Sequence, residues 1–339
     1  MEFPWMLGVV FVSLRLVFGS SDLAGVRLAD GPDPLWELVL ALIQAQTRDH
    51  RYVAWRRDVH RRLVTARRAG VPAAIGALRE LVPPHGDFPD FLTPPSTKDF
   101  DVGCEVIAGT PRTRLRIEIA AVFTNRTAPP SVRSLTTDAG TSLGELIEVV
   151  RYAHGALLAP YWSSICDAVA AERARRARAL TASGAGEFLA GLPGSLLWDG
   201  EVLTTGYPVD RTVVLGGRGI TVVPTYFCSG DPVTFIDPDL PPVLVCPLAD
   251  AAGLVDSPPV SAGLARLLGE TRACCLDALR TRMTTSELAQ RLDITVGAAS
   301  KHAAVLRQNG LIASTRRGGA VLHQLTRLGA ALLAGAEPE

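Results

Sequence analysis

"TTSELAQRLDITVGAASKHAAVLRQNGLI", residues Thr284–Ile312, decides the fold of the C-terminal part of the chain. Its Thr/Ser start, with Glu287 in the first turn, is typical of a helix N-terminus. A second helix begins after Thr295, a residue type that caps helices, and ends at Gly310, which tolerates the left-handed backbone of a helix C-terminus. The stretch therefore predicts two helices joined by a tight turn.

The second helix, over 295–309, has two contrasting faces. The set predicted to be buried repeats at helical spacing and consists of Val296, Ala299, Ala303 and Leu306. The opposite side combines small residues with hydrogen-bond donors, namely Gly297, Ser300, Lys301, Ala304 and Gln308, with His302 and Arg307 on its flanks. Small residues allow close approach to a surface, and the polar ones suit phosphate oxygens and major-groove base edges. We interpret 295–309 as a recognition helix that enters the major groove.

The flanking pattern is helix, helix, then this pair, then a hairpin and a last helix from about Leu328. Residues 312–325 are predicted to form the hairpin, with Gly318 and Gly319 at its tip. Arg316 and Arg317 beside the tip would form a basic wing that reaches the DNA backbone or the minor groove. The candidate DNA-binding residues are therefore Thr295, Ser300, Lys301, His302, Arg307, Gln308, Arg316 and Arg317.

Charge is distributed unevenly along the chain. The 339 residues are formally neutral, yet 261–339 hold ten Lys or Arg against six Asp or Glu, a balance of +4 that leaves −4 for the rest. Positive charge is thus concentrated where nucleic acid would bind. A small helical bundle with a solvated basic face is the alternative. The caps, the helix spacing, the hairpin and the charge together favour nucleic-acid binding.

The segment from about Ala262 to Leu333, a fifth of the chain, resembles the winged helix-turn-helix domain of ArsR-type (ArsR/SmtB-like) bacterial regulators. The resemblance rests on "LLGETRACCLDAL", "RRGGAVLHQLTRLG" and the opening stretch. It implies a homodimer that binds an imperfect palindrome in double-stranded DNA and represses until an effector lowers its affinity. It also implies that Ser300, Lys301 and His302 contact DNA, with Arg307 in support. Two departures are Asp293, where Gly is common in the turn, and "TTSELAQRL", which lacks the cysteine motif of the metal-sensing members.

Metal ions and cofactors are not expected. The cysteines show no CxxC spacing, which indicates mostly buried thiols in a reducing compartment; they are Cys104, Cys166, Cys228, Cys246, Cys274 and Cys275. Neighbouring helical residues point about 100° apart, so Cys274 and Cys275 cannot easily chelate one ion. Cys275 is in phase with Leu268 and Leu279 and is predicted to be core. The six histidines show no HxH or HExxH spacing.

The chain is predicted to belong to the α+β class, with two domains. Residues 1–255 would be a regulatory or dimerisation module, helical to about 195 and β-rich over about 198–247, and 260–335 the winged helix-turn-helix domain. Helices are expected behind Pro34 and over Leu143–Leu180. The β-rich part is predicted to be a small antiparallel sheet or meander, with a turn at 216–219, and Asp250–Pro259 a linker.

The apolar run Leu7–Phe18 is too short to span a bilayer, which takes roughly twenty residues, and it contains Arg15. It also lacks the basic start of a signal peptide. The alternation in Val12–Phe18 favours a strand. We therefore expect a soluble, cytoplasmic protein with no membrane partner.

The N-terminal part resembles the uncharacterised N-terminal module of a subset of ArsR-like regulators, a likeness that implies no mechanism. It rests on "GPDPLWELVLAL", "FPDFLTPP", "LLAPYW" and "PVTFIDPDLPPVLVCP". No GxSxG elbow, Walker loop or strand-linked GxGxxG occurs, and the sequence around Ser195 lacks the elbow spacing. An acidic set in a Pro-rich turn is interpreted as turn formers: Asp231, Asp237 and Asp239.

Two groups in this part leave alternatives open. One is aromatic and could line an apolar ligand pocket or be core: Trp36, Tyr161, Trp162, Tyr226 and Phe227. The other is an arginine run that could be a solvated face, an interdomain salt-bridge strip or a second DNA contact: Arg173, Arg175, Arg176 and Arg178.

The sequence thus predicts a sequence-specific DNA-binding transcription regulator, a repressor without enzymatic activity, whose N-terminal module dimerises or senses a small-molecule effector. The alternative is a small-molecule-binding or enzymatic N-terminal domain with an accessory winged helix that binds a protein partner. A protein-binding winged helix has no need for Lys301, Arg307, Arg316 and Arg317 together, which favours the DNA-binding hypothesis.

Overall fold

The structure, a computed structural model, describes residues 13–65, 76, 78–95, 99–124, 126–137, 139–249, 254, 262–280, 282–292, 294–317 and 320–334. The predicted linker Asp250–Pro259 lies outside these residues apart from Leu254, and so do Asp293 and the hairpin tip. The chain divides into two compact units, Met1–Thr47 with Leu63–Ala252, and Arg48–Arg62 with Gly253–Glu339. Within the described residues, no helix is both long enough and apolar enough to cross a bilayer.

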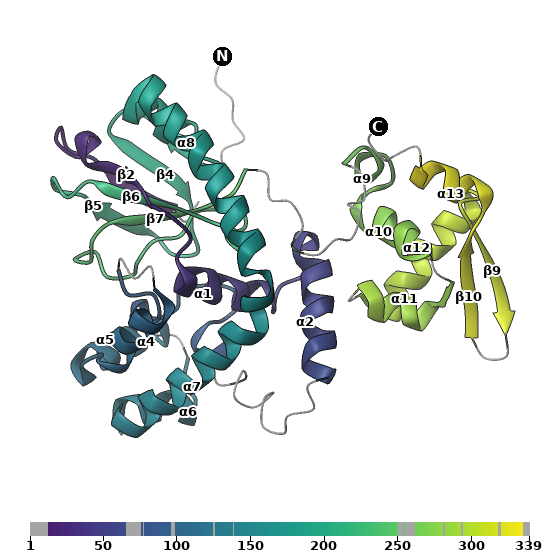
Figure 1. Cartoon of the computed structure of the whole chain (residues 1–339), viewed down its shortest axis with the longest axis horizontal. Helices are drawn as coiled ribbons and strands as arrows, with labels where there is room; N and C mark the ends of the chain where they lie inside the picture. Colours follow the sequence, from purple (N-terminus) through teal and green to yellow (C-terminus); the bar gives the residue numbers. More distant parts are fainter. Residues whose placement is uncertain are drawn as a thin grey trace, which may run out of the picture. The chain divides into compact units, whose positions relative to one another are not determined.

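The first unit combines helices with short strands, in keeping with the α+β class (Figure 1). Its helices are α1 (Pro34–Gln44), α4 (Phe100–Ala108), α5 (Arg112–Val122), α6 (Pro130–Thr137), α7 (Ala139–Leu157) and α8 (Trp162–Ala190), with short 3-10 turns η1 (Leu23–Gly25), η3 (Asp90–Leu92) and η4 (Ala159–Tyr161). Its strands are β1 (Ser13–Val17), β2 (Val26–Leu28), β3 (Leu197–Trp198), β4 (Val202–Gly206), β5 (Arg211–Val214), β6 (Ile220–Thr225) and β7 (Val243–Pro247).

The strands form two sheets, and the predicted antiparallel meander is wrong. One sheet has the order β3-β4-β1-β5 and the other β2-β6-β7. β1 pairs antiparallel with β4 but parallel with β5, while β2–β6 and β6–β7 are both parallel. Of the two strands from the start of the chain, β1 thus lies between β4 and β5, and β2 lies at the edge of its sheet beside β6. Each short run has strand character, but periodicity within a run cannot reveal such a distant partner.

The turn at 216–219 exists, but it carries the chain from one sheet to the other rather than closing a hairpin. Gly219 has φ +65°, and a Cβ atom there would lie 2.2 Å from the carbonyl oxygen of Gly25. Asp22 is fully buried beneath this crossing, and its carboxylate accepts hydrogen bonds from the N–H groups of Gly19 (2.7 Å) and Gly219 (2.9 Å). Asp22 therefore joins the residues that follow β1 to the turn that precedes β6.

Both sheets share one hydrophobic core, closed by the C-terminal end of α8. Leu14 and Leu16 of β1 point inward and Arg15 outward, as the alternation predicts. Figure 1 shows α8 running along the strands, and it packs against β2, β3 and β6. Phe188 and Leu189 from the last turns of α8 enter the core after the helix is broken at Gly184, whose φ is +78°.

The expected helices behind Pro34 and over Leu143–Leu180 are present. Asp33 accepts hydrogen bonds from the N–H groups of Leu35 and Trp36 and so caps α1. The longer pattern is two helices, α7 and α8, separated by η4, which carries Pro160. Proline lacks an N–H and cannot continue a helix interior, which accounts for the break.

In the second unit, α10, α11, α12 and α13 pack together beside a small sheet (Figure 1). The elements are η2 (His50–Tyr52) and most of α2 (Val53–Thr65), then α9 (Ala262–Leu268), α10 (Glu270–Ala278), β8 (Met283–Thr284), α11 (Thr285–Leu292), α12 (Val296–Gln308), β9 (Ile312–Arg317), β10 (Ala320–Leu325) and α13 (Arg327–Ala334). This is the predicted succession of helices and hairpin, with β8 added to give the order β8-β10-β9. The sequence did not indicate that Arg48–Arg62 would group with these elements.

Candidate nucleic-acid interface

The start of α11 is held by a reciprocal cap between Thr284 and Glu287. The Thr284 N–H and hydroxyl donate to Glu287 Oε2 at 2.7 and 2.9 Å, and the Glu287 N–H donates to the Thr284 hydroxyl at 3.2 Å. These bonds, led by the one from the backbone N–H, lower the pKa of Glu287. The inward side of α11 carries Leu288, Ala289 and Leu292, all buried. The capping pattern read from the sequence is therefore present.

α12 begins four residues after the end of α11. Thr295 accepts a hydrogen bond from the Ala298 N–H at 3.1 Å, as its N-cap assignment predicts. At the far end, the Leu311 N–H donates to the Leu306 carbonyl at 2.9 Å and the Gly310 N–H to the Arg307 carbonyl at 3.0 Å. With Gly310 at φ +70°, this is a Schellman C-cap. Both ends of α12 are thus set by the residues named from the sequence.

The inward face of α12 is confirmed at three of its four predicted positions. Ala299 is fully buried, and Ala303 and Leu306 are 1% exposed. Val296 is 52% exposed, so its assignment to the buried stripe is wrong. Side chains on a helix tilt toward its N-terminus, and Val296 is the first helical residue. Its side chain therefore extends past the end of the helix, beyond the residues that cover Ala299.

The outward face of α12 is polar and open. Gly297, Ser300, Lys301 and Gln308 are exposed, and Arg307 is exposed on the flank. A Cβ atom on Gly297 would meet nothing within 4 Å, so the first turn presents an uncovered backbone. Thr295 is also exposed, while its side chain serves as the cap.

His302 lies apart from the other candidates on α12. Successive helical residues are separated by about 100°, so Ser300, Lys301 and His302 cannot share one face. His302 is half-buried, and burial, followed by the positive charge of Arg272, lowers its pKa. Both its burial and Arg272 on α10 therefore favour the uncharged form of the His302 ring.

The β9–β10 hairpin stands next to these helices. The strands pair antiparallel, with Arg316 opposite Val321 and Ser314 opposite His323, and β8 pairs with β10 only at Leu322 and His323. Arg316 is exposed at the outer end of β9. The side chain of Arg317 lies outside the described residues, as do Gly318 and Gly319.

His323 is a residue of this unit that sequence reasoning missed. It is 4% exposed, and its two ring nitrogens lie 2.7 Å from the Ser314 hydroxyl and 2.9 Å from the Thr285 hydroxyl. Burial, followed by the charge of Arg307, lowers its pKa. The sequence contained one feature that could have pointed to His323: a polar ring at a position of the strand where the alternation predicts a buried side chain.

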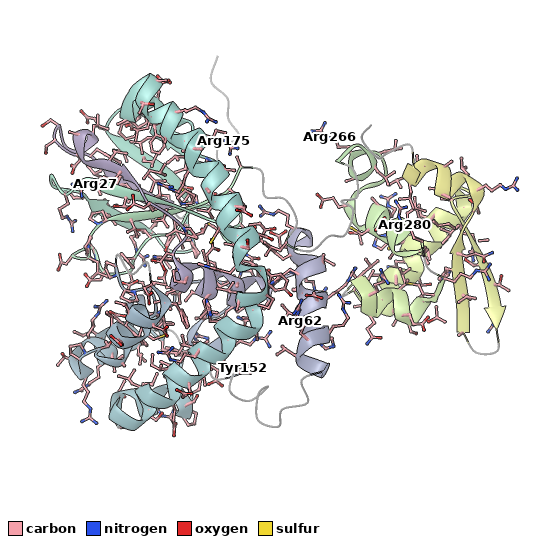
Figure 2. The ribbon with its side chains drawn as sticks, in the orientation of Figure 1. Arg27, Arg62, Tyr152, Arg175, Arg266 and Arg280 are labelled. Carbon is pink, nitrogen blue, oxygen red and sulfur yellow. The ribbon has the colours of Figure 1, made fainter. Side chains whose placement is uncertain are left out.

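Basic side chains are spread over the surface of this unit. From α9 onward, the exposed ones are Arg266, Arg272, Arg280, Arg282, Arg291, Lys301, Arg307, Arg316 and Arg327. Figure 2 shows Arg266 projecting from α9, and Arg280 pairs with Asp277 at 2.9 Å. The positive balance inferred from the sequence is thus displayed at the surface, on α12 and the hairpin as well as elsewhere.

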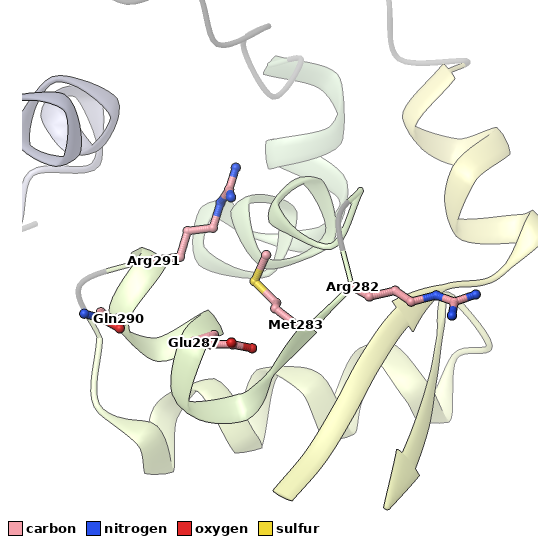
Figure 3. A pocket seen from close by; sticks show the side chains of 5 residues that line it. All are labelled: Arg282, Met283, Glu287, Gln290 and Arg291. Carbon is pink, nitrogen blue, oxygen red and sulfur yellow. The ribbon is translucent and has the colours of Figure 1, made fainter. Parts of the chain in front are cut away.

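A shallow pocket of about 350 Å³ lies on the outside of α11 and β8 (Figure 3). Its lining residues are Arg282, Met283, Glu287, Gln290 and Arg291. Figure 3 shows Arg282 and Arg291 extending from opposite sides, with Met283 and Glu287 between them. Because Glu287 already serves as the partner of Thr284, its carboxylate is committed to the cap.

The cysteine pair is arranged as the helical geometry predicts. Cys275 is fully buried and Cys274 is half-buried. Burial raises the pKa of both thiols, that of Cys275 to about 12. Among the described residues, no three His, Cys, Asp or Glu side chains gather as they would around a metal ion.

In the first unit, most of the aromatic candidates are core. Trp36, Tyr161, Tyr226 and Phe227 are buried, and Trp162 is half-buried. Of the predicted turn formers, Asp237 acts as one, because its side chain accepts from the Asp239 N–H at 2.9 Å. Asp231 instead accepts from the Ser195 hydroxyl, 36 residues away, at 2.5 Å. Ser195 thereby ties two loops together.

Two arginines of the predicted run, Arg173 and Arg176, serve the interior of the first unit. Arg176 is buried; its Nε contacts Glu172 at 2.5 Å and another nitrogen donates to the Pro247 carbonyl at 3.0 Å. Arg173 donates to the Ala29 carbonyl at 2.5 Å. None of the three readings of the run describes these two residues. Arg175 and Arg178 are exposed, as a solvated face predicts.

Two buried carboxylates also escaped the sequence reading. Glu37 is fully buried and accepts from the N–H groups of Tyr226 (2.8 Å) and Phe227 (3.1 Å), and burial raises its pKa to about 8. Asp90 accepts from Ile236 and Asp237, and burial raises its pKa to about 7. Of the two, only Glu37 could have been noticed in the sequence, because it is the one carboxylate in the apolar helix α1.

One part of the chain has a partial likeness to a protein of known structure. No family model matches the chain, and no curated protein matches it. Among solved structures, reduced HlyU from Vibrio cholerae matches with 27% identity over 21% of this chain and 77% of the HlyU chain, at a TM-score of 0.20. At that TM-score the likeness decides neither fold nor function. Both rest on the residues of this chain.

Proposed function

We propose that this protein is a sequence-specific DNA-binding transcription regulator, a repressor, whose C-terminal unit is a winged helix-turn-helix domain. In this proposal α12 enters the major groove, and the β9–β10 hairpin contacts the backbone or the minor groove. The capped α11–turn–α12 arrangement and the hairpin beside it support the assignment.

The observation that carries the proposal is the contrast between the two faces of α12. Ala299, Ala303 and Leu306 hold the helix to the core. On its outer side Lys301 and Gln308 stand exposed beside an uncovered first turn. Donors on a helix that a groove can accommodate are what base edges and phosphates require.

The proposed DNA-bound form is a homodimer that reads an imperfect palindrome. Leu267 on α9 and Leu328 on α13, which are 69% and 58% exposed, are large apolar side chains that a contact between copies would cover. Large apolar side chains so exposed are a common mark of protein–protein contacts when they form a patch. The N-terminal unit is proposed to respond to a small-molecule effector, and no catalytic step is assigned to the chain.

The decisive experiment is selection of DNA sites from a random library by the full-length protein. We expect an inverted repeat whose half-sites are separated by about one or two helical turns, roughly 10 bp each. The spacing reports the dimer geometry directly. Recovery of no enriched motif contradicts the proposal and leaves the protein-binding winged helix as the better explanation.

A pair of variants that remove the same charge then tests whether the outward face of α12 contacts DNA. Lys301→Ala should weaken binding to the selected site on the order of 10-fold and make the dependence on salt less steep by about one, because one contact to the DNA is lost. Arg266→Ala removes the same charge from α9 and should change binding little. Equal losses in both variants would mean that only the overall charge matters.

A further inference from the structure

His323 joins three elements through one buried ring. It belongs to β10, its Nδ1 lies 2.7 Å from Ser314 Oγ on β9, and its Nε2 lies 2.9 Å from Thr285 Oγ1 at the start of α11. With 4% exposure, the ring cannot exchange these partners for water at no cost. The contact therefore couples the hairpin to the helix pair.

The chemistry of the three groups suits a fixed junction. A neutral imidazole has one donor and one acceptor nitrogen, and a hydroxyl can donate or accept, so both bonds form with the ring uncharged. Burial and Arg307 both favour the uncharged ring by lowering its pKa. Both hydrogen bonds of the junction can therefore form without a buried charge.

The position of His323 along the hairpin determines which part of the hairpin its hydrogen bonds can orient. β8 supports β10 only at Leu322 and His323, so the outer half of the hairpin is a two-stranded ribbon. Such a ribbon is marginally stable by itself. Arg316 lies two residues beyond Ser314 on the same face of β9, and its place in space depends on the direction in which the ribbon leaves the junction.

We propose that His323 is a positioning residue: its bonds to Ser314 and Thr285 set the direction of the β9–β10 hairpin against α11 and α12, so that Arg316 reaches the phosphate backbone of DNA. This inference rests on the proposed function, because it assigns to the hairpin a role in the same complex. His323 itself does not contact the nucleic acid.

The first test uses the free full-length protein and needs no DNA. His323→Phe keeps a buried aromatic ring and removes both bonds. Amide hydrogen exchange should then accelerate on the order of 10-fold in β9 and β10 while α12 keeps its protection. Unchanged exchange in the hairpin of a folded His323→Phe variant would overturn the proposal. If that variant fails to fold, Thr285→Val, which removes one bond and keeps the shape, takes its place.

The second test uses the selected DNA site and asks whether His323 acts through Arg316. Arg316→Ala and His323→Phe should each make the salt dependence less steep by about one, and the double variant should bind as weakly as Arg316→Ala alone. Additive losses would mean that His323 does not act through Arg316. If the wild-type protein selects no site, the proposed function fails, and the exchange experiment still decides whether His323 orients the hairpin.

Discussion

Gly329 of α13 lies directly against the carbonyl oxygen of Leu311: a Cβ atom on Gly329 would be 2.1 Å from it. The same oxygen accepts the Thr326 N–H at 3.1 Å, and the Thr326 hydroxyl accepts the Gly329 N–H at 3.1 Å. The last helix is therefore docked on the residue that follows the C-cap of α12, with no space for a side chain between them.

Gly329→Ala should destabilise the C-terminal unit by about 1–3 kcal/mol, because either α13 or the turn at Leu311 must shift. Gly297→Ala is the matched control, since a Cβ atom there meets nothing within 4 Å. In a helix this exchange should stabilise by up to about 1 kcal/mol. Thermal unfolding of both variants checks the contrast, and a Gly329→Ala protein as stable as the wild type would contradict the docking.

The buried carboxylates make the stability of the first unit depend on pH. Burial raises the folded-state pKa of Glu37 from 4.5 to about 8 and that of Asp90 from 3.8 to about 7. Between these limits the folded protein binds more protons than the unfolded chain, so stability falls as pH rises from about 4 to 8. Each group contributes up to about 1.4 kcal/mol per pH unit.

Urea unfolding at pH 5, 6, 7 and 8, followed by tryptophan fluorescence, measures this slope. Glu37→Gln carries no titrating group and should make the fall with pH less steep. A wild-type protein that grows more stable from pH 5 to 8, or an unchanged slope in Glu37→Gln, would contradict the assignment.

Val296 and Leu306 occupy the same predicted stripe of α12 but should respond differently to truncation. Leu306 is 1% exposed and Val296 52% exposed. Leu306→Ala should cost about 2–5 kcal/mol through lost burial and a cavity. Val296→Ala should change stability by less than about 0.5 kcal/mol, as surface substitutions do. Chemical unfolding measures the free energy of unfolding of the two variants. Similar losses in both would mean that Val296 is buried like Leu306.

Thr295→Ala should cost about 0.5–2 kcal/mol, because the Ala298 N–H at the start of α12 loses its partner. Thr295→Ser keeps the hydroxyl and should behave like the wild type. The free energy of unfolding of the two variants separates the cap from the other contacts of Thr295, and equal losses would show that the hydroxyl is not what matters.

Cys275 should resist alkylation in the folded protein, because its thiol is buried and its pKa is raised to about 12. Cys274, half-buried with a raised pKa, should react slowly. Mass spectrometry after timed iodoacetamide treatment distinguishes the two. Stoichiometric zinc binding that protects both thiols would contradict the expectation that they bind no metal.

The sequence by itself determined the helix pair, the caps and most of the inward face of α12. The caps act on backbone groups only a few residues away, so they can be predicted from the local sequence. The capping residues are Thr284 with Glu287, Thr295 and Gly310. The burial of Ala299, Ala303 and Leu306 follows from the 3.6-residue period in the same way.

Only the tertiary structure decided which distant residues meet. β1 and β2 pair with strands nearly two hundred residues later, and Asp22 accepts a hydrogen bond from the Gly219 N–H. His323 forms a hydrogen bond with Thr285 of another element, and Arg176 donates to the carbonyl of Pro247. Caps and periodicity act over a few residues, whereas these pairings depend on which surfaces pack together once the chain has folded. Local sequence could therefore name the helix proposed to read DNA, and the packed structure was needed to find the residue that orients the hairpin beside it.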